Sequence, residues 1–155
     1  MKGVFLVTVA KIVYASLTGN TEEIADIVAE ALESHDVEVE VNECTQVDAA
    51  DFLDADICIV ASYTYDDFLL PDEIIDFHEE LLDLDLTGKV YGVVGSGDTF
   101  YPYFCQVVDQ FDKAFASVGA TKGAQSVKVE LAPEEQDIVA LQSFAKILVE
   151  KSKLN

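Results

Sequence analysis

The hydrophobic residues of this 155-residue chain switch repeatedly between two spacings. Short apolar or alternating runs, typical of strands, lie at residues 11–15, 37–41, 57–61, 90–94 and 126–131. Apolar residues at helical spacing follow each strand except the second, at residues 24–32, 72–82, 107–118 and 133–148, the last helix opening at Pro133. Five strands alternating with helices through short connections predict an α/β fold: one doubly wound parallel sheet with helices on both faces.

Three loops of such a sheet are candidates for ligand binding. Ligands of doubly wound sheets bind at the carboxyl ends of the strands, near the point where the strand order reverses. The loops that follow the first, third and fourth expected strands, residues 16–21, 62–70 and 95–103, meet at that edge. We call them the rim loops.

The first rim loop reads Ser16-Leu17-Thr18-Gly19-Asn20-Thr21 and opens the first helix. Free N–H groups at a helix N-terminus form an anion site, and hydroxyl donors complete it without a cation. The loop has no lysine after its glycine and no GxGxxG pattern, so it indicates a monophosphate rather than ATP or a dinucleotide. The alternative is that Asn20 and Glu23 only cap the helix.

The other two rim loops are rich in aromatic residues. Residues 63–68 and 100–104 hold seven of the fifteen aromatic side chains of the chain. A flat heterocycle stacked between rings explains this excess, with Phe104 turned into the core instead. In residues 95–99, Gly-Ser-Gly-Asp-Thr, the glycines let backbone amides approach a ligand closely. A phosphate loop beside two stacking loops predicts a mononucleotide with a planar head.

The charge of the chain excludes several classes of function. It has 30 Asp and Glu against 9 Lys and no Arg, a net charge of −21. This excludes ordinary nucleic-acid binding and recognition of anions by an arginine fork. The acids either serve solubility alone or steer a basic partner.

Other residue types add expectations about location and metals. No run approaches the roughly 18 to 20 apolar residues that span a bilayer. Three cysteines without a CxxC pair predict reduced thiols and a cytoplasmic location. His35 and His78 are isolated, so we expect no metal site. Residues 1–9 faintly resemble a signal peptide but lack a cleavage site, and we treat them as an N-terminal extension of uncertain role before a single domain at 10–155.

At the three rim loops the sequence resembles the flavodoxins, and the similarity extends over nearly all of residues 10–150. Residues 16–21 match the phosphate motif T/S-x-T-G-N-T of that family. Residues 62–68 match its second loop in part, and residues 95–101, followed by Phe104 and Cys105, resemble G-S-G-D-x-x-Y. The last strand lacks the insertion of long-chain members, so the chain resembles the short-chain bacterial class.

The resemblance implies a flavodoxin-like five-stranded sheet of order 2-1-3-4-5 and non-covalently bound FMN. Tyr65 and Tyr101 would cover the two faces of the isoalloxazine, and amides near Gly97 and Asp98 would meet its pyrimidine edge. The phosphate would lie on Ser16, Thr18, Asn20 and Thr21. No catalytic residue is implied, and the full set of expected cofactor-binding residues is Ser16, Leu17, Thr18, Gly19, Asn20, Thr21, Ser62, Tyr63, Thr64, Tyr65, Asp66, Asp67, Ser96, Gly97, Asp98, Tyr101, Phe104 and Cys105. For Cys105, packing as a small buried hydrophobe is the alternative role.

The second rim loop departs from the family pattern. Asp66 and Phe68 stand where the family has glycine, and Leu69 replaces an acidic residue. In the family, the peptide at the first position flips toward the flavin when it takes up one electron, which is easiest with glycine. We therefore expect Asp66 to weaken stabilisation of the one-electron-reduced state by about 1 kcal/mol. Phe68 and Leu69 either extend a docking rim or pack on the flavin edge.

The expected function is that of a low-potential one-electron carrier. As a monomer, it would shuttle electrons between a flavodoxin or ferredoxin reductase and acceptor redox enzymes, its acids facing basic partners. Each carboxylate about 10 Å from the flavin, Asp67 and Asp98 being best placed, would oppose reduction by roughly 0.8 kcal/mol, or about 35 mV.

Three alternatives come from other classes. An FMN-dependent reductase with its own small substrate needs extra loops or a dimer surface, for which the chain has little spare length. An FMN-loaded interaction module would carry no electron flux. A phosphorylated receiver domain needs acids and a lysine where this chain has Ser16, Leu17, Ser62 and Leu131.

Overall fold

The computed structural model describes residues 7–64, 70–100 and 104–154, and it confirms the parallel sheet. The strands β1 (Val9–Tyr14), β2 (Glu38–Glu43), β3 (Ile57–Tyr63) and β4 (Val90–Gly97) lie in the order β2-β1-β3-β4. The fifth position holds two short segments, β5 (Thr121–Lys122) and β6 (Val127–Glu130), each of which pairs parallel to β4. The expected order 2-1-3-4-5 is therefore correct, with its last strand in two parts.

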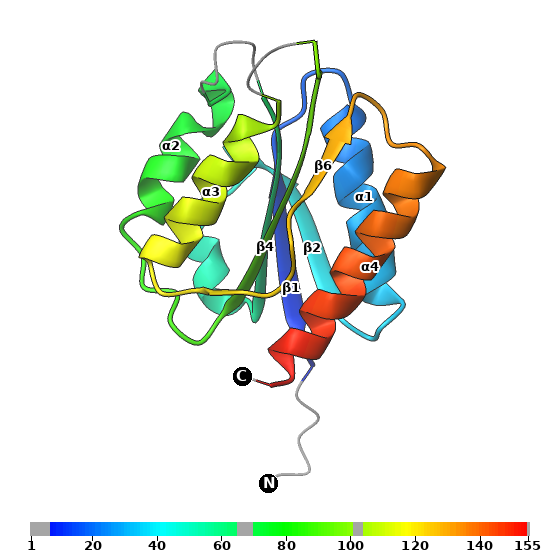
Figure 1. Cartoon of the computed structure of the whole chain (residues 1–155). Coiled ribbons are helices and arrows are strands. Elements are labelled where there is room, and N and C mark those ends of the chain that lie inside the picture. The colour runs from blue at the N-terminus through cyan, green and yellow to red at the C-terminus, as the bar shows by residue number, and fades with distance from the viewer. Residues whose placement is uncertain (1–6, 65–69, 101–103, 155) are drawn as a thin grey trace, which may run out of the picture.

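Helices cover both faces of the sheet (Figure 1). The helices α1 (Asn20–Glu33) and α4 (Glu135–Ser152) pack together on one face, and α2 (Asp72–Leu81) and α3 (Gln106–Ser117) cover the other. Two short 3-10 helices, η1 (Cys44–Gln46) and η2 (Ala49–Asp54), connect β2 to β3 and are absent from the sequence-based expectation. Within the described ranges, no helix is both long and apolar enough to cross a membrane.

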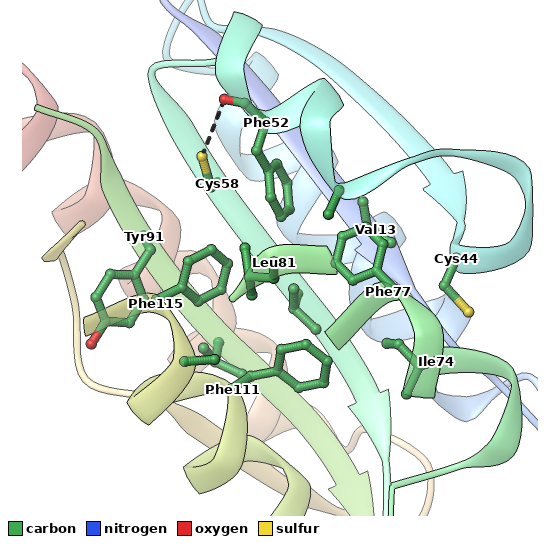
Figure 2. Packing of buried hydrophobic residues seen from close by; sticks show 14 of the residues in the cluster. Val13, Cys44, Phe52, Cys58, Ile74, Phe77, Leu81, Tyr91, Phe111 and Phe115 are labelled. Carbon is green, nitrogen blue, oxygen red and sulfur yellow. Dashed lines mark hydrogen bonds between the residues drawn. The ribbon is translucent and has the colours of Figure 1, made fainter. Parts of the chain in front are cut away.

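The two faces of the sheet have different cores. The face under α1 and α4 is mainly aliphatic, whereas the face under α2 and α3 is aromatic (Figure 2). There, Phe52 meets Phe77 edge-on with ring centroids 5.7 Å apart, and Tyr91 stacks on Phe115 at 4.8 Å. Both faces of β3 are covered, which explains why its seven residues are all buried and why its sequence is a continuous apolar run.

At the C-terminal side, one close approach has no counterpart in the sequence-based expectation, and the expected start of the last helix is wrong. Gly123 lies between β5 and β6, and a Cβ there would collide with the side chains of Val90 and Leu148, so this part of the strand passes very close to its neighbours. Pro133 does not open α4: Glu134 is the N-cap, and its backbone N–H donates to Asp137 Oδ2 at 2.9 Å.

The register brings the rim loops together at the carboxyl edge. Ser62 and Tyr63 at the end of β3 lie opposite Gly95 and Ser96 of β4. A Cβ on Gly95 would lie 2.5 Å from the backbone oxygen of Ser62 and 2.6 Å from Cγ2 of Val108, so only glycine allows this approach of β3, β4 and α3.

Candidate functional site

The first rim loop connects β1 to α1 and is closed by the hydroxyl of Ser16. Ser16 Oγ accepts hydrogen bonds from the backbone N–H groups of Gly19, at 3.1 Å, and Glu22, at 3.3 Å. Gly19 is the N-cap and has a φ of 92°, a conformation that glycine adopts without strain. Asn20 is the first helical residue, so the alternative in which Asn20 and Glu23 only cap the helix is wrong.

The start of α1 presents unused donors. The backbone N–H groups of Thr18, Asn20 and Thr21 have no acceptor within the described part of the chain. N–H groups at a helix N-terminus that lack partners, together with the helix dipole, favour a bound anion. This donor set fits a phosphate.

A cavity of about 120 Å³ lies beside these donors. All three rim loops contribute to its lining, and Leu131, which follows β6, completes it. The residues from the rim loops are Leu17, Thr18, Asn20, Thr21, Tyr63, Thr64, Ser96, Gly97 and Asp98. Nine of the expected cofactor-binding residues therefore surround one cavity.

Two contacts join the three rim loops at their base. Thr21 Oγ1 and Ser96 Oγ are 2.8 Å apart and buried, which connects the first loop to the third. The backbone oxygen of Ser96 accepts the N–H of Thr64 at 3.1 Å, which connects the third loop to the second.

The second rim loop is anchored to the helices under it. The Tyr63 hydroxyl donates to Glu73 Oε1 of α2 at 2.5 Å, and the ring belongs to the aromatic core. Ser62 is buried and donates to the backbone oxygen of Tyr63, while Thr64 Oγ1 accepts the N–H of Val107 at the start of α3. The expected contacts of Tyr65, Asp66 and Asp67, with Phe68 and Leu69, lie outside the described residues.

The third rim loop is held to β6. Thr99 donates to Glu130 through both its N–H, at 3.2 Å, and its hydroxyl, and the N–H of Leu131 donates to the oxygen of Gly97 at 2.8 Å. Asp98 Oδ1 accepts the N–H of Phe100 at 2.9 Å. Tyr101 and Tyr103 lie outside the described residues.

Phe104 and Cys105 pack against the third rim loop and do not line the cavity: a Cβ on Gly97 would lie 3.2 Å from Phe104 Cδ1 and 3.1 Å from Cys105 Sγ. Phe104 is half-buried against the aromatic core, as the sequence predicts. Cys105 is fully buried, and its burial raises the pKa of the thiol to about 12. A thiol that stays protonated and enclosed behaves as a small hydrophobe, the alternative that we considered for Cys105.

Apolar side chains and Asp98, but no cation, line the cavity among the residues that the structure describes. Phe100, Leu17 and Leu131 are 83%, 62% and 52% exposed, and the last two line the cavity itself. Leu131 has a φ of 58°, which a branched residue seldom adopts, and sequence reasoning gave no signal for it. No lysine lines the cavity among the described residues, and none occurs in residues 65–69 or 101–103.

Among the described residues, neither His78 nor any cluster of potential metal ligands forms a second candidate site. His78 is half-buried edge-on to Phe111, with ring centroids 5.1 Å apart, and burial lowers its pKa, so the ring is neutral near pH 7. The described residues contain no group of three metal-ligating side chains.

Comparisons with known proteins agree with this geometry. The family model for flavodoxin matches residues 12–141. A probable flavodoxin 2 of Bacillus subtilis (strain 168) is 37% identical over 142 residues, covering 91% of this chain and 94% of the relative. The solved flavodoxin of Streptococcus pneumoniae TIGR4 is 62% identical with a TM-score of 0.92, covering 93% of this chain and 99% of that chain. A short-chain flavodoxin associated with a bacterial microcompartment is 50% identical, also with a TM-score of 0.92, covering 94% and 99%.

Flavodoxins bind FMN and transfer electrons without converting a substrate of their own, which removes the alternative of an FMN-dependent reductase. The phosphate-fitting donors at α1, the cavity between the rim loops and the match over most of the sequence agree with one another. This chain belongs to the flavodoxin family and is an FMN-binding electron carrier.

Proposed function

We propose that this chain carries single electrons from a basic reductase to basic electron-accepting redox enzymes as a monomer in the cytoplasm. The observation that carries the proposal is the cavity between the rim loops. Its described lining offers free N–H groups and hydroxyls and no cation, and exposed apolar side chains flank it. Flavodoxin-like domains act in electron transfer with redox enzymes. Three buried free thiols support a reducing compartment.

Within this proposal, residues 10–155 form the FMN-binding domain and the first rim loop holds the phosphate. The hydroxyls of Ser16, Thr18 and Thr21, the amide of Asn20 and the free N–H groups of α1 would donate to it. Ser16 Oγ already accepts two N–H groups, so its own proton remains available to an oxygen of the ligand.

The isoalloxazine would occupy the side of the cavity formed by the second and third rim loops. Backbone groups of Thr64, Gly97 and Asp98 would meet its edge, and Tyr65 and Tyr101 would cover its faces. When bound, FMN supplies reversible one-electron redox chemistry.

The acids of the chain would make the bound cofactor a strong reductant. Asp98 lines the cavity and Glu130 lies beside the third rim loop, within a chain of net charge −21. A carboxylate about 10 Å away in an effective dielectric near 40 opposes the arrival of an electron by roughly 0.8 kcal/mol. Several such carboxylates lower the potential by roughly 35 mV each.

The exposed apolar side chains at the rim would form the contact through which electrons pass. Leu17 and Leu131 line the cavity together with Asp98, and Phe100 follows Thr99, whose N–H donates to Glu130. A partner with a basic surface and an apolar centre therefore fits them. Electrostatic steering would speed the encounter, and salt would slow it.

Electron transfer to a basic haem protein tests this function. A flavin-containing NADPH reductase reduces the reconstituted chain, and stopped-flow absorbance follows reduction of horse-heart cytochrome c at several ionic strengths. We expect the chain to increase the rate of reduction, and this rate to fall steeply with salt. A rate no higher than with reductase alone would refute electron carriage to this acceptor, and a salt-independent rate would refute steering.

A pair of surface variants tests the docking contact. Phe100→Ala should slow transfer several-fold, because the ring is 83% exposed in the third rim loop. Ile147→Ala is the matched control, since Ile147 is 47% exposed on α4 and lies far along that helix from the rim. Equal rates for the two variants would place the contact elsewhere.

A further inference from the structure

Two buried hydroxyl groups meet where the first and third rim loops join. Thr21 Oγ1 and Ser96 Oγ lie 2.8 Å apart, and both residues line the cavity. Each hydroxyl carries one proton, and the hydrogen bond between them uses one of the two. The second proton has no acceptor in the described ranges of the chain, so it is available to a ligand.

The surroundings of the two residues differ. Thr21 is the second residue of α1, next to the N–H groups that have no acceptor. Ser96 is fixed within the sheet, where it pairs with Tyr63 of β3 and Val129 of β6. Its backbone oxygen, not its hydroxyl, accepts the N–H of Thr64. Thr21 therefore belongs to the phosphate loop, and Ser96 belongs to the rigid support under it.

We propose that Ser96 is a positioning residue for the phosphate: it donates its proton to Thr21 Oγ1, so that the Thr21 hydroxyl donates to a phosphate oxygen. This inference rests on the proposed placement of the phosphate at residues 16–21. A hydroxyl that accepts one hydrogen bond becomes a stronger donor in the next, and a bond to a charged oxygen is stronger than a neutral one. Because the described lining of the cavity holds no cation, such polarised neutral donors supply the attraction that an arginine or lysine supplies elsewhere.

Paired titrations with FMN and riboflavin test this role, because the two ligands differ only in the phosphate. Ser96→Ala should weaken FMN binding about fivefold to tenfold, the effect of one hydrogen bond, and change riboflavin binding less than about twofold. Ser96→Cys keeps the size of the side chain with a weaker donor and should give an intermediate loss. In a Thr21→Val background, Ser96→Ala should cost less than about twofold, because the hydroxyl it polarises is gone.

The matched control is Ser117→Ala. Its hydroxyl donates to the backbone oxygen of Ala114 at 2.7 Å near the end of α3, and its removal should leave both affinities unchanged. Thermal unfolding of each apoprotein shows whether it is folded, and Ser96→Cys carries the test if Ser96→Ala does not fold.

Other outcomes overturn the inference. Equal losses of FMN and riboflavin binding would mean that Ser96 contacts the flavin or the ribityl chain, or only supports the fold. If neither the FMN affinity nor the riboflavin affinity fell, the Ser96 hydroxyl would have no role in binding. Additive losses of FMN affinity in the double variant would mean that Ser96 and Thr21 act independently. If Thr21→Val and Ser16→Ala both kept the preference for FMN over riboflavin, the proposed phosphate site itself would be wrong.

Discussion

Replacement of Gly95 by alanine should disturb the sheet at the point where the rim loops begin. The added Cβ would lie 2.5 Å from the Ser62 backbone oxygen and 2.6 Å from Val108 Cγ2, about 0.9 and 0.8 Å short of ordinary contact at 3.4 Å. The first atom is held by the pairing of β3 with β4, and the second belongs to a fully buried side chain of α3. Neither can yield alone, so β3 or α3 must move.

The expected cost is that of an overpacked core, roughly 2 kcal/mol of unfolding free energy. For a domain of this size it lowers the melting temperature by roughly 4–8 °C. Because the displacement spreads Ser62 and Ser96 at the base of the cavity, we expect FMN binding to weaken about tenfold as well. Urea unfolding of the apoprotein measures the first effect, and a titration followed by flavin fluorescence measures the second.

Gly88→Ala separates steric overlap from backbone strain. Gly88 has a φ of 90°, and a Cβ there would meet no atom within 4 Å, so this variant bears only the strain of about 1 kcal/mol. Its position before β4, at the opposite end from the rim, should leave FMN binding unchanged. The reasoning fails if Gly95→Ala is no less stable than Gly88→Ala, or if it binds FMN as tightly as the parent chain.

Three further results are expected. Tyr91→Phe should lower the unfolding free energy by about 1.5–3 kcal/mol in urea unfolding, because it removes the bond of 2.5 Å from the buried ring to the Asp112 carboxylate; a loss below about 0.5 kcal/mol would contradict this. Burial raises the pKa of each of the three thiols to about 12 from an ordinary value of 9.0, so the folded state keeps protons that the unfolded chain releases. The contribution of the thiols to the unfolding free energy should therefore be constant below pH 9 and fall by up to about 4 kcal/mol per pH unit as the pH rises from 9 toward 12. Substituting the three thiols by alanine should reduce that slope. Asp66→Gly, a prediction from the sequence alone, should widen the separation of the two one-electron potentials by strengthening the one-electron-reduced state, and an unchanged separation in a spectroelectrochemical titration would refute it.

The sequence predicts the strands and helices whose buried apolar residues recur at a regular spacing. The apolar run at residues 57–61 belongs to β3, which is covered on both faces, and the helical spacing at residues 107–118 matches α3 to within one residue at either end. The fifth strand is less regular. Thr121 and Lys122 of β5 are exposed and carry no alternation, so only their backbone pairing with β4 identifies them as a strand.

At the site, the motifs predict which loops meet but not how their side chains pair. The phosphate loop is recognisable because its hydroxyls and glycine lie within six consecutive residues. The bond between Thr21 and Ser96 spans 75 positions, and the bond from Tyr63 to Glu73 depends on how α2 packs. Such partners follow from tertiary packing, which leaves no local signal. Ser16, rather than Asn20, closes the first turn of α1 through local contacts, because its hydroxyl accepts the N–H groups of Gly19 and Glu22, and Asn20 is already inside the helix.

Because no lysine or arginine lines the cavity in the described part of the chain, salt should have opposite effects on cofactor binding and on partner docking. A phosphate approaching the rim meets only neutral donors at close range and, at longer range, the repulsion of a protein with a net charge of −21. Added salt screens that repulsion, so FMN should bind more tightly as ionic strength rises. Basic partners are attracted by the same charge and should be released under those conditions. A buffer of high ionic strength that dissociates the carrier from its partners would therefore raise its affinity for the cofactor.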